Sequence, residues 1–233
     1  RHGWKWAFFF IPVAFLGWRQ YRGQGPSLEA QIQNLPETVP QSWAAHLLAG
    51  TYFKGRGLRD EAVDHFRQVV RYNPDLAEGH VFLADMLYKR GDDFGALEEY
   101  RLAEELDSSN GLVRMNLGYL YLRRDQPLLA EPHFRAGLVQ EPANADMHFG
   151  LGSALLRQHR FEEAKPYFES SLRLDPAHSE AINSLGMIED LAGDPAGAAA
   201  LYRRALEADS SNASARANLA AILPKLNPPV TAP

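Results

Sequence analysis

The central part of this sequence repeats every 34 residues. Five segments align without an insertion or deletion, and each carries one alanine at the same place: Ala62, Ala96, Ala130, Ala164 and Ala198. Four residues after each alanine stands an aromatic residue: Phe66, Tyr100, Phe134, Phe168 and Tyr202. Twelve residues before each alanine stands a small residue: Gly50, Ala84, Gly118, Gly152 and Gly186. A period of this length with several matched columns is typical of repeat proteins, in which each unit packs only against its neighbours.

Each unit is predicted to form two amphipathic helices joined by a tight turn. In "ADMHFGLGSALLRQHR" and "EEAKPYFESSLRLD" apolar residues recur at three- and four-residue spacing, the period of a helix with one buried face. Turn residues separate the two helices, as in "RGDDFG" and "AGDPAG". The small residues should let the paired helices approach closely, with the aromatic ring beside that contact.

Proline or a capping residue is expected where the second helix ends. Pro74, Pro142 and Pro176 occupy this column, and proline cannot continue a helical hydrogen-bond ladder. In the other two copies "DSSN" stands there, with an asparagine placed to cap the helix that follows.

The residues at these aligned positions resemble the sequence pattern of the tetratricopeptide repeat family. The family pattern of Leu-Gly, then alanine, an aromatic residue four positions on and proline is matched by "NLGYLYL" with Ala130, Phe134 and Pro142. The resemblance implies an all-α fold, a right-handed α-solenoid of antiparallel helix pairs preceded here by a hydrophobic helix. The family pattern begins with a tryptophan, but the five repeats of this chain have other residues at that position: His46, His80, Arg114, His148 and Ile182.

The repeat also sets the expected domain boundaries. Residues 1–22 form a hydrophobic segment, 23–42 a linker, 213–226 a capping helix and 227–233 a proline-rich tail. Pro224, Pro228 and Pro229 are expected to end the capping helix. Between linker and capping helix lie the five repeats, at 43–76, 77–110, 111–144, 145–178 and 179–212.

Charge and composition argue against several functions. The chain has a net charge of −5, and because residues 1–42 carry four basic and two acidic residues, the remainder carries −7. An acidic domain is a poor partner for nucleic acid.

With no cysteine and no HExxH-type histidine pair, we expect no metal and no cofactor. The carboxylate pairs Glu98–Glu99 and Glu162–Glu163 are expected near the start of second helices, where the helix dipole favours acids. We therefore expect no catalytic residue and no enzyme activity.

By the resemblance, a binding groove should lie on the first helix of each repeat. Its implied apolar members are Phe82, Tyr88, Met115, Tyr119, Phe149, Leu156 and Met187. Its implied basic members are Lys54, Lys89, Arg123 and Arg157, and its polar members are Asp85, Asn116, Ser153 and Asn183. Such a groove would suit an extended or helical peptide with apolar anchors and some acidic residues. The alternative is that the aromatic residues belong to the helix–helix core and the basic residues to solvated helix ends.

Some family members hold a C-terminal carboxylate with fixed Lys, Asn and Arg side chains. The equivalent positions here are Leu47, Thr51, Asn116, Asp146 and Gly150. Only Asn116 matches, so we do not expect this mode of binding.

The stretch "WKWAFFFIPVAFLGWRQYR" near the start permits three interpretations: a strip that folds back on the array, a cleaved signal peptide, or an uncleaved membrane anchor. Counted from Trp4 to Tyr21 a helix would be about 27 Å long, close to the thickness of a hydrocarbon core. Aromatic residues at both ends suit the membrane interfaces. We favour the anchor, with these members: Trp4, Trp6, Phe8, Phe9, Phe10, Phe15 and Trp18.

The sequence therefore predicts a non-catalytic scaffold, tethered to a membrane by a single N-terminal span, that binds partner proteins or peptides in its groove. Basic residues flank the span almost equally, so charge does not set its orientation; an exported array is our working expectation. Two alternatives stay open: a constitutive accessory subunit of a membrane complex, or a regulatory module of an enzyme encoded elsewhere.

Overall fold

The computed structural model describes residues 30, 32, 34 and 41–226 of the chain. The predicted anchor at 1–22, most of the predicted linker and the tail at 227–233 lie outside these residues. Among the described residues, no helix has the length and apolar character needed to cross a membrane. The helices divide into two compact units, one up to Ser108 and one from Ser109, which are described separately.

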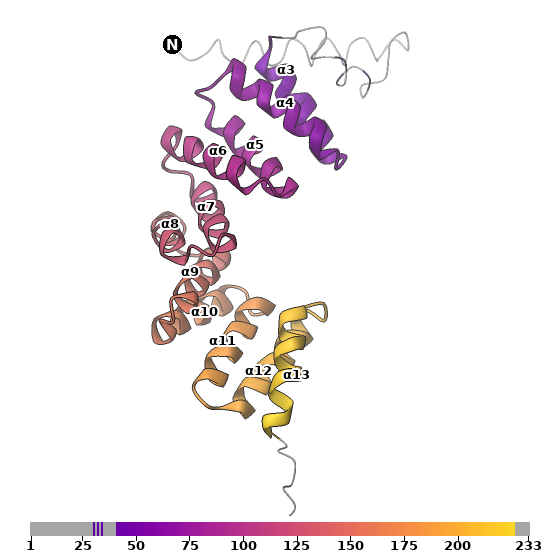
Figure 1. Cartoon of the computed structure of the whole chain (residues 1–233). Coiled ribbons are helices and arrows are strands. Elements are labelled where there is room, and N and C mark those ends of the chain that lie inside the picture. Colours follow the sequence, from indigo (N-terminus) through magenta and orange to yellow (C-terminus); the bar gives the residue numbers. More distant parts are fainter. Residues whose placement is uncertain (1–29, 31, 33, 35–40, 227–233) are drawn as a thin grey trace, which may run out of the picture. The chain divides into compact units, whose positions relative to one another are not determined.

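In the first unit, the described residues from 41 onward form two helix pairs, drawn in indigo and magenta in Figure 1. The helices are α3 (Trp43–Gly55), α4 (Arg59–Tyr72), α5 (Ala77–Arg90) and α6 (Asp93–Leu106). Each packs against the next along the chain. The antiparallel pairing expected from the repeat is therefore present in this unit.

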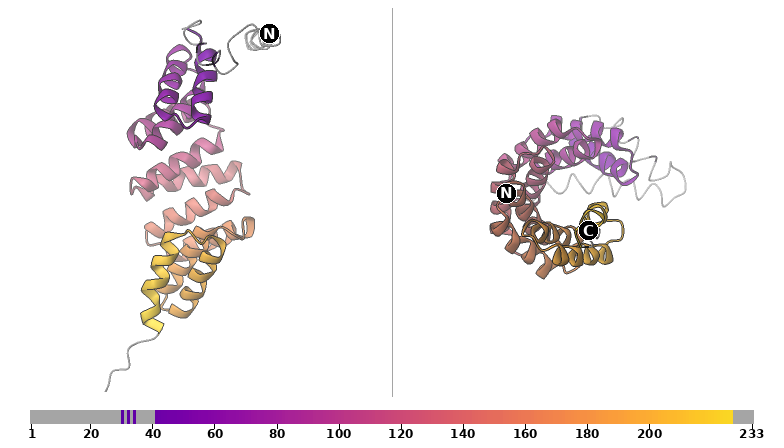
Figure 2. Two further views of the ribbon diagram at one scale, coloured as in Figure 1. Left: turned by 90° about the vertical axis from the view of Figure 1, so that its right-hand side faces the viewer. Right: turned by 60° about the horizontal axis from the view of Figure 1, so that its bottom comes forward.

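In the second unit, three helix pairs and a final single helix follow within residues 109–226. They are α7 (Gly111–Arg123), α8 (Pro127–Gln140), α9 (Ala145–Arg157), α10 (Phe161–Leu174), α11 (Ser179–Leu191), α12 (Pro195–Ala208) and α13 (Ala213–Leu226). Successive helices within these pairs pack together, and first helices also meet, α7 with α9 and α11 with α13. Figure 2 shows α13, in yellow, beside the helices of the last pair.

The helix ends lie where the sequence signals predict them. Pro74, Pro142 and Pro176 each stand two residues after the last residue of a second helix. Asn110 and Asn212, the asparagines of the two "DSSN" copies, accept hydrogen bonds from the backbone amides of Val113 and Ala215 at 3.2 and 2.9 Å. Such a bond satisfies an amide that has no partner within its own helix.

One position in every intra-repeat turn has left-handed backbone geometry. It is occupied by Gly57, Gly91, Asp125, His159 and Gly193, with φ of 74°, 88°, 56°, 60° and 86°. Glycine adopts this conformation without steric cost, whereas a residue with a Cβ loses about 1–2 kcal/mol there. Asp125 and His159 therefore carry strain that the other three turns avoid.

In four of the five repeats, the core contains one aromatic ring set against one glycine. The five rings of the aromatic column are all buried. At Gly50, Gly118, Gly152 and Gly186 an added Cβ would lie within 3 Å of ring atoms of the aromatic residue sixteen positions later. The small column is thus a steric requirement of the fold, because the ring occupies the space that a side chain would need.

The tyrosines of this column also keep their hydroxyl groups within the packed structure. Tyr100 donates a hydrogen bond of 2.6 Å to Asp85 on the paired helix. Burial, with Asp190 nearby, raises the pKa of Tyr202 to about 12, so its phenol stays neutral at physiological pH.

The last helix, α13, covers the apolar face of the final pair. Ile222 is buried against Ala198, Ala199 and Tyr202. Pro224 lies inside α13, which is described to Leu226, and Pro228 and Pro229 lie outside the described residues.

The histidines of the variable column pack between the helices of the described repeats. His46 Nδ1 lies 3.0 Å from His65 Nδ1, and the His65 ring stacks on Phe53. His80 contacts Glu99 at 2.7 Å, and His148 contacts the carbonyl of Pro142 at 2.9 Å. Among the described residues, no three His, Asp or Glu side chains gather in a way that would hold a metal ion.

The contact between Gly118 and the Phe134 ring predicts an unusual response to alanine. A Cβ at Gly118 would lie 2.6–2.8 Å from three ring atoms of Phe134. Alanine favours a helix over glycine by about 1 kcal/mol, but overpacking a core costs about 1–3 kcal/mol. We expect Gly118→Ala to lose about 1–2 kcal/mol in urea unfolding. Adding Phe134→Leu should cost less than the sum of the two single changes, because the smaller side chain relieves the clash.

Gly55→Ala is the matched control, because nothing lies within 4 Å of a Cβ at that position. It should leave stability unchanged or raise it. A Gly118→Ala variant as stable as the parent would contradict the steric account.

The His46–His65 pair predicts a pH-dependent stability. Burial, and then the charge of His46, hold the pKa of His65 below the ordinary value of 6.5. As pH falls below 6.5 the unfolded chain therefore binds this proton before the folded chain does, and stability declines until the lower folded pKa is passed. Urea midpoints measured between pH 5 and 8 should fall toward acid, and less steeply in His65→Gln. Equal slopes for parent and variant would refute the assignment.

Candidate functional site

In the first unit, the predicted groove residues Lys54, Phe82 and Asp85 lie together. The Lys54 ammonium stands 4.8 Å from the centre of the Phe82 ring and 3.8 Å from a carboxylate oxygen of Asp85. The Phe82 ring in turn stacks on Phe66, with 5.3 Å between ring centroids. These three side chains therefore link α3 to α5. Tyr88 is half-buried and Lys89 is exposed on α5.

In the second unit, Tyr119 and Phe149 connect the core to the surface. Tyr119 meets Phe134 edge to face at 5.1 Å, and its hydroxyl donates a 2.6 Å hydrogen bond to the backbone carbonyl of Asp146. Phe149 lies 5.9 Å from Phe168 and 4.7 Å from His178 between ring centroids. Both side chains are half-buried. Each of these side chains thus contacts a buried ring of the aromatic column while part of it stays exposed.

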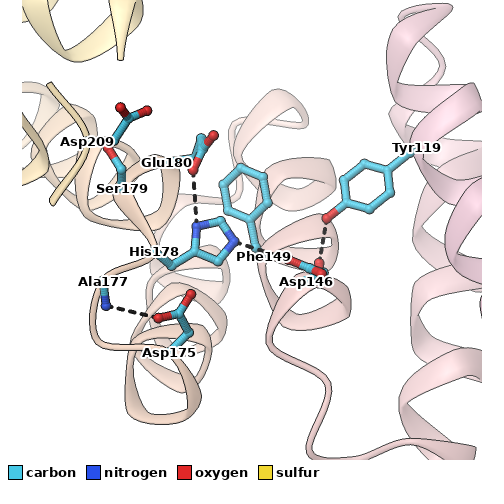
Figure 3. Close-up of a pocket in the computed structure, with 9 residues that line it drawn as sticks. All are labelled: Tyr119, Asp146, Phe149, Asp175, Ala177, His178, Ser179, Glu180 and Asp209. Atoms are coloured by element: carbon cyan, nitrogen blue, oxygen red, sulfur yellow. Dashed lines mark hydrogen bonds and ion pairs between the residues drawn. The ribbon is translucent and has the colours of Figure 1, made fainter. Parts of the chain in front are cut away.

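Two hollows adjoin at Phe149, each of about 450 Å³. The first, which we call the acidic hollow, is shown in Figure 3. It is lined by Tyr119, Asp146, Phe149, Asp175, Ala177, His178, Ser179, Glu180 and Asp209. The second, the apolar hollow, is lined by Phe149, Ser153, Leu156, Arg157, His159, Phe161, Ser184, Met187 and Leu191.

The acidic hollow is organised around His178. Its Nε2 lies 3.5 Å from an Asp146 oxygen and its Nδ1 lies 3.4 Å from a Glu180 oxygen, so the ring stands between two carboxylates (Figure 3). Nδ1 also accepts a hydrogen bond from the amide of Ala181 at the start of α11. His178 is therefore held by its own helix while its ring forms part of the wall beside Phe149.

The other two carboxylates of this hollow, Asp175 and Asp209, accept hydrogen bonds from residues two positions later in the chain. Asp175 accepts a 3.1 Å hydrogen bond from the amide of Ala177. Asp209 accepts hydrogen bonds from the hydroxyl and amide of Ser211, and these hold the pKa of Asp209 below its usual range. Both residues follow second helices, so the turns between repeats keep these charges at the hollow.

The predicted basic residues of the second unit differ in their contacts. Arg157 lines the apolar hollow, and its guanidinium donates a 2.6 Å hydrogen bond to the carbonyl of Leu122 and lies 3.7 Å from Asp125. Arg157 thus joins α9 to the C-terminal end of α7. Arg123 is exposed and lines neither hollow.

The remaining predicted residues of the second unit divide into two groups. Ser153, Leu156 and Met187 line the apolar hollow. Met115 and Asn116 are half-buried on α7 and line neither hollow.

Asn183 was expected to face the groove, and that expectation was wrong. Its side chain is 6% exposed, and its carbonyl oxygen accepts a 2.9 Å hydrogen bond from Asn218 on α13. The family pattern places this position inward in an internal repeat. In the last repeat, α13 covers it.

The four carboxylates of the acidic hollow are the main residues that sequence reasoning missed. Their spacing was visible, because Asp146 and Glu180 are 34 residues apart, as are Asp175 and Asp209. Asp146 and Glu180 lie at the starts of first helices, whereas Asp175 and Asp209 follow the ends of second helices. No single position of the repeat therefore shows that these four carboxylates line one hollow.

Comparison with known sequences gives one family match. The profile of a family described as tetratricopeptide repeat matches residues 38–111, 115–164 and 151–213, which together cover more than half of the chain. Comparison with curated proteins found no match.

Several solved structures share the fold. The crystal structure of MamA is 20% identical over 69% of this chain and 94% of its own, with a TM-score of 0.64. YrrB, described as a TPR protein with an unusual peptide-binding site, is 15% identical over 80% of this chain and 96% of its own, with a TM-score of 0.67. MamA from Desulfovibrio magneticus RS-1 is 20% identical over 73% of this chain and 97% of its own, also with a TM-score of 0.67.

Proposed function

This chain belongs to the tetratricopeptide repeat family and has its helical solenoid fold, and from that premise we propose that it is a non-catalytic scaffold for partner proteins. It binds them through the groove formed by the acidic and apolar hollows, and it recruits or assembles protein complexes at a membrane. The observation that carries the proposal is that the two hollows share one wall residue, Phe149.

The groove suits a peptide because its walls are fixed and its surface is mixed. The small-residue and aromatic columns hold the first helices in place, so little ordering is required of the protein on binding. Leu156, Met187 and Leu191 provide apolar contact in one hollow, and charged groups surround the other. Affinity in such surfaces comes from a few buried apolar anchors, while polar groups fix register. A peptide-binding site is also what is described for YrrB.

The membrane part of the proposal rests on the sequence of residues 1–22. The apolar run there contains no acidic residue, and tryptophan or tyrosine stands near both of its ends. Lys5 and Arg19 can extend their charged groups toward the interfaces while their alkyl chains stay in the apolar layer. The groove would then hold its partner close to the bilayer.

One experiment tests both parts of this proposal. The full chain, the chain without residues 1–22, and the full chain with Leu156→Gln are expressed in the native cell, and membranes are washed with high salt. We expect the full chain to stay in the membrane pellet and the shortened chain to be released. Proteins captured with the full chain should be lost from Leu156→Gln, because the apolar anchor site becomes polar.

Val139→Gln is the matched control, because Val139 is an exposed apolar residue on α8 that lines neither hollow. It should capture the same proteins as the parent. Release of the full chain by salt would contradict the anchor, and capture unaffected by Leu156→Gln would contradict the groove. Constant capture of one membrane complex in fixed stoichiometry would instead favour a permanent accessory subunit.

A further inference from the structure

We propose that the groove of the second unit selects peptide segments that place a lysine or arginine side chain in the acidic hollow and an apolar side chain in the apolar hollow. This inference rests on the proposed function, since it names the chemistry of the partner that the same groove binds. It also reverses the expectation from the sequence, where the basic residues pointed to an acidic ligand.

The acidic hollow presents negatively charged side chains to a ligand. Its nine lining residues include four carboxylates and no lysine or arginine. Asp146 and Glu180 keep most of their side chains in solvent, at 65% and 62% exposure, so a ligand can reach them. Carboxylates in a concave surface attract a cationic group and repel an acidic one.

The acidic hollow is also lined by aromatic rings. Tyr119, Phe149 and His178 all contribute rings to its lining, and Figure 3 shows Phe149 and Tyr119 on either side of Asp146. A guanidinium or ammonium group is attracted to the face of an aromatic ring. Rings and carboxylates together therefore provide both kinds of contact that an arginine side chain makes.

Neither predicted basic residue of the second unit, Arg123 or Arg157, lines the acidic hollow. Arg157 faces the other hollow and is held by the carbonyl of Leu122 and by Asp125. Arg123 lines neither hollow. Within the acidic hollow, the charge that a ligand meets is thus set by the carboxylates.

The two hollows adjoin, which limits how far apart the two bound side chains can be in the partner's sequence. Because Phe149 lines both hollows, the side chains that fill them must be near neighbours in the partner's sequence. The apolar hollow contains Leu156, Phe161, Met187 and Leu191, which match an aliphatic side chain such as leucine. The recognised element is therefore a cationic residue followed or preceded at short range by an apolar one.

The test uses the full chain in detergent and short fluorescein-labelled peptides in a glycine–serine background. One series carries arginine and leucine separated by zero to three residues, and matched series carry glutamate for arginine or serine for leucine. Fluorescence anisotropy gives each Kd at low and at high sodium chloride. We expect at least one arginine–leucine peptide to bind about 10-fold more tightly than its glutamate–leucine match, and to lose affinity with salt.

The deciding variant is Asp146→Asn with Glu180→Gln, which removes two charges and keeps side-chain size. It should reduce the preference for arginine over glutamate to about 2-fold or less, while the preference for leucine over serine remains. The matched control is Glu162→Gln with Glu169→Gln, which changes the net charge equally through two exposed residues of α10 outside both hollows. It should keep the preference for arginine.

Any of three binding results would overturn the inference: equal or tighter binding of the glutamate–leucine peptide, an equal loss of preference in the control variant, or no binding of any peptide. A dimer seen by sedimentation that excludes the peptides would assign the groove to a second copy of the chain and also overturn it. If Leu156→Gln still abolishes partner capture while arginine peptides show no advantage, this inference fails and the proposed function stands.

Discussion

The structure depends on one contact that recurs in four of the five repeats, an aromatic ring against a glycine. The ring of Phe134 fills the space next to Gly118, and Phe168 does the same next to Gly152. Truncating such a buried ring costs about 3–5 kcal/mol, a large share of the stability of a small domain. Gly118 and Phe134 belong to one repeat, so this contact joins its paired helices, and the Phe134 ring also fills the space next to Gly150 of the following repeat.

This contact leaves the outer part of the first helices available for binding. Phe149 illustrates the division, since one side of its ring meets Phe168 of the core and the ring also lines both hollows. Carboxylates at the turns between repeats also contribute to this surface. Asp175 and Asp209 accept hydrogen bonds from residues of their own turns. Asp146 and Glu180 lie in the first turns of α9 and α11. The same repeat that builds the scaffold therefore also repeats the chemistry of its groove.

The sequence predicted the helical repeat, the helix pairs and the asparagine caps, because each rests on local spacing or on one column. It predicted less of the surface. Asn183 occupies a groove position by the repeat pattern but is covered by α13, and only the packing of the last repeat reveals this. The acidic hollow combines residues from helix starts and helix ends, which no single column displays. His65 is likewise brought to His46 by the turn between α3 and α4, across 19 residues.

The central claim is that partners bind on the face of the first helices. Site-specific photo-cross-linking tests it most directly, with a benzophenone amino acid placed at Leu191 or at Val139 of the full chain. Both side chains are apolar and exposed, at 61% and 84%, but only Leu191 lines a hollow. The account predicts covalent partner adducts from position 191 and none from position 139. Adducts only from position 139, or equally from both, would contradict it.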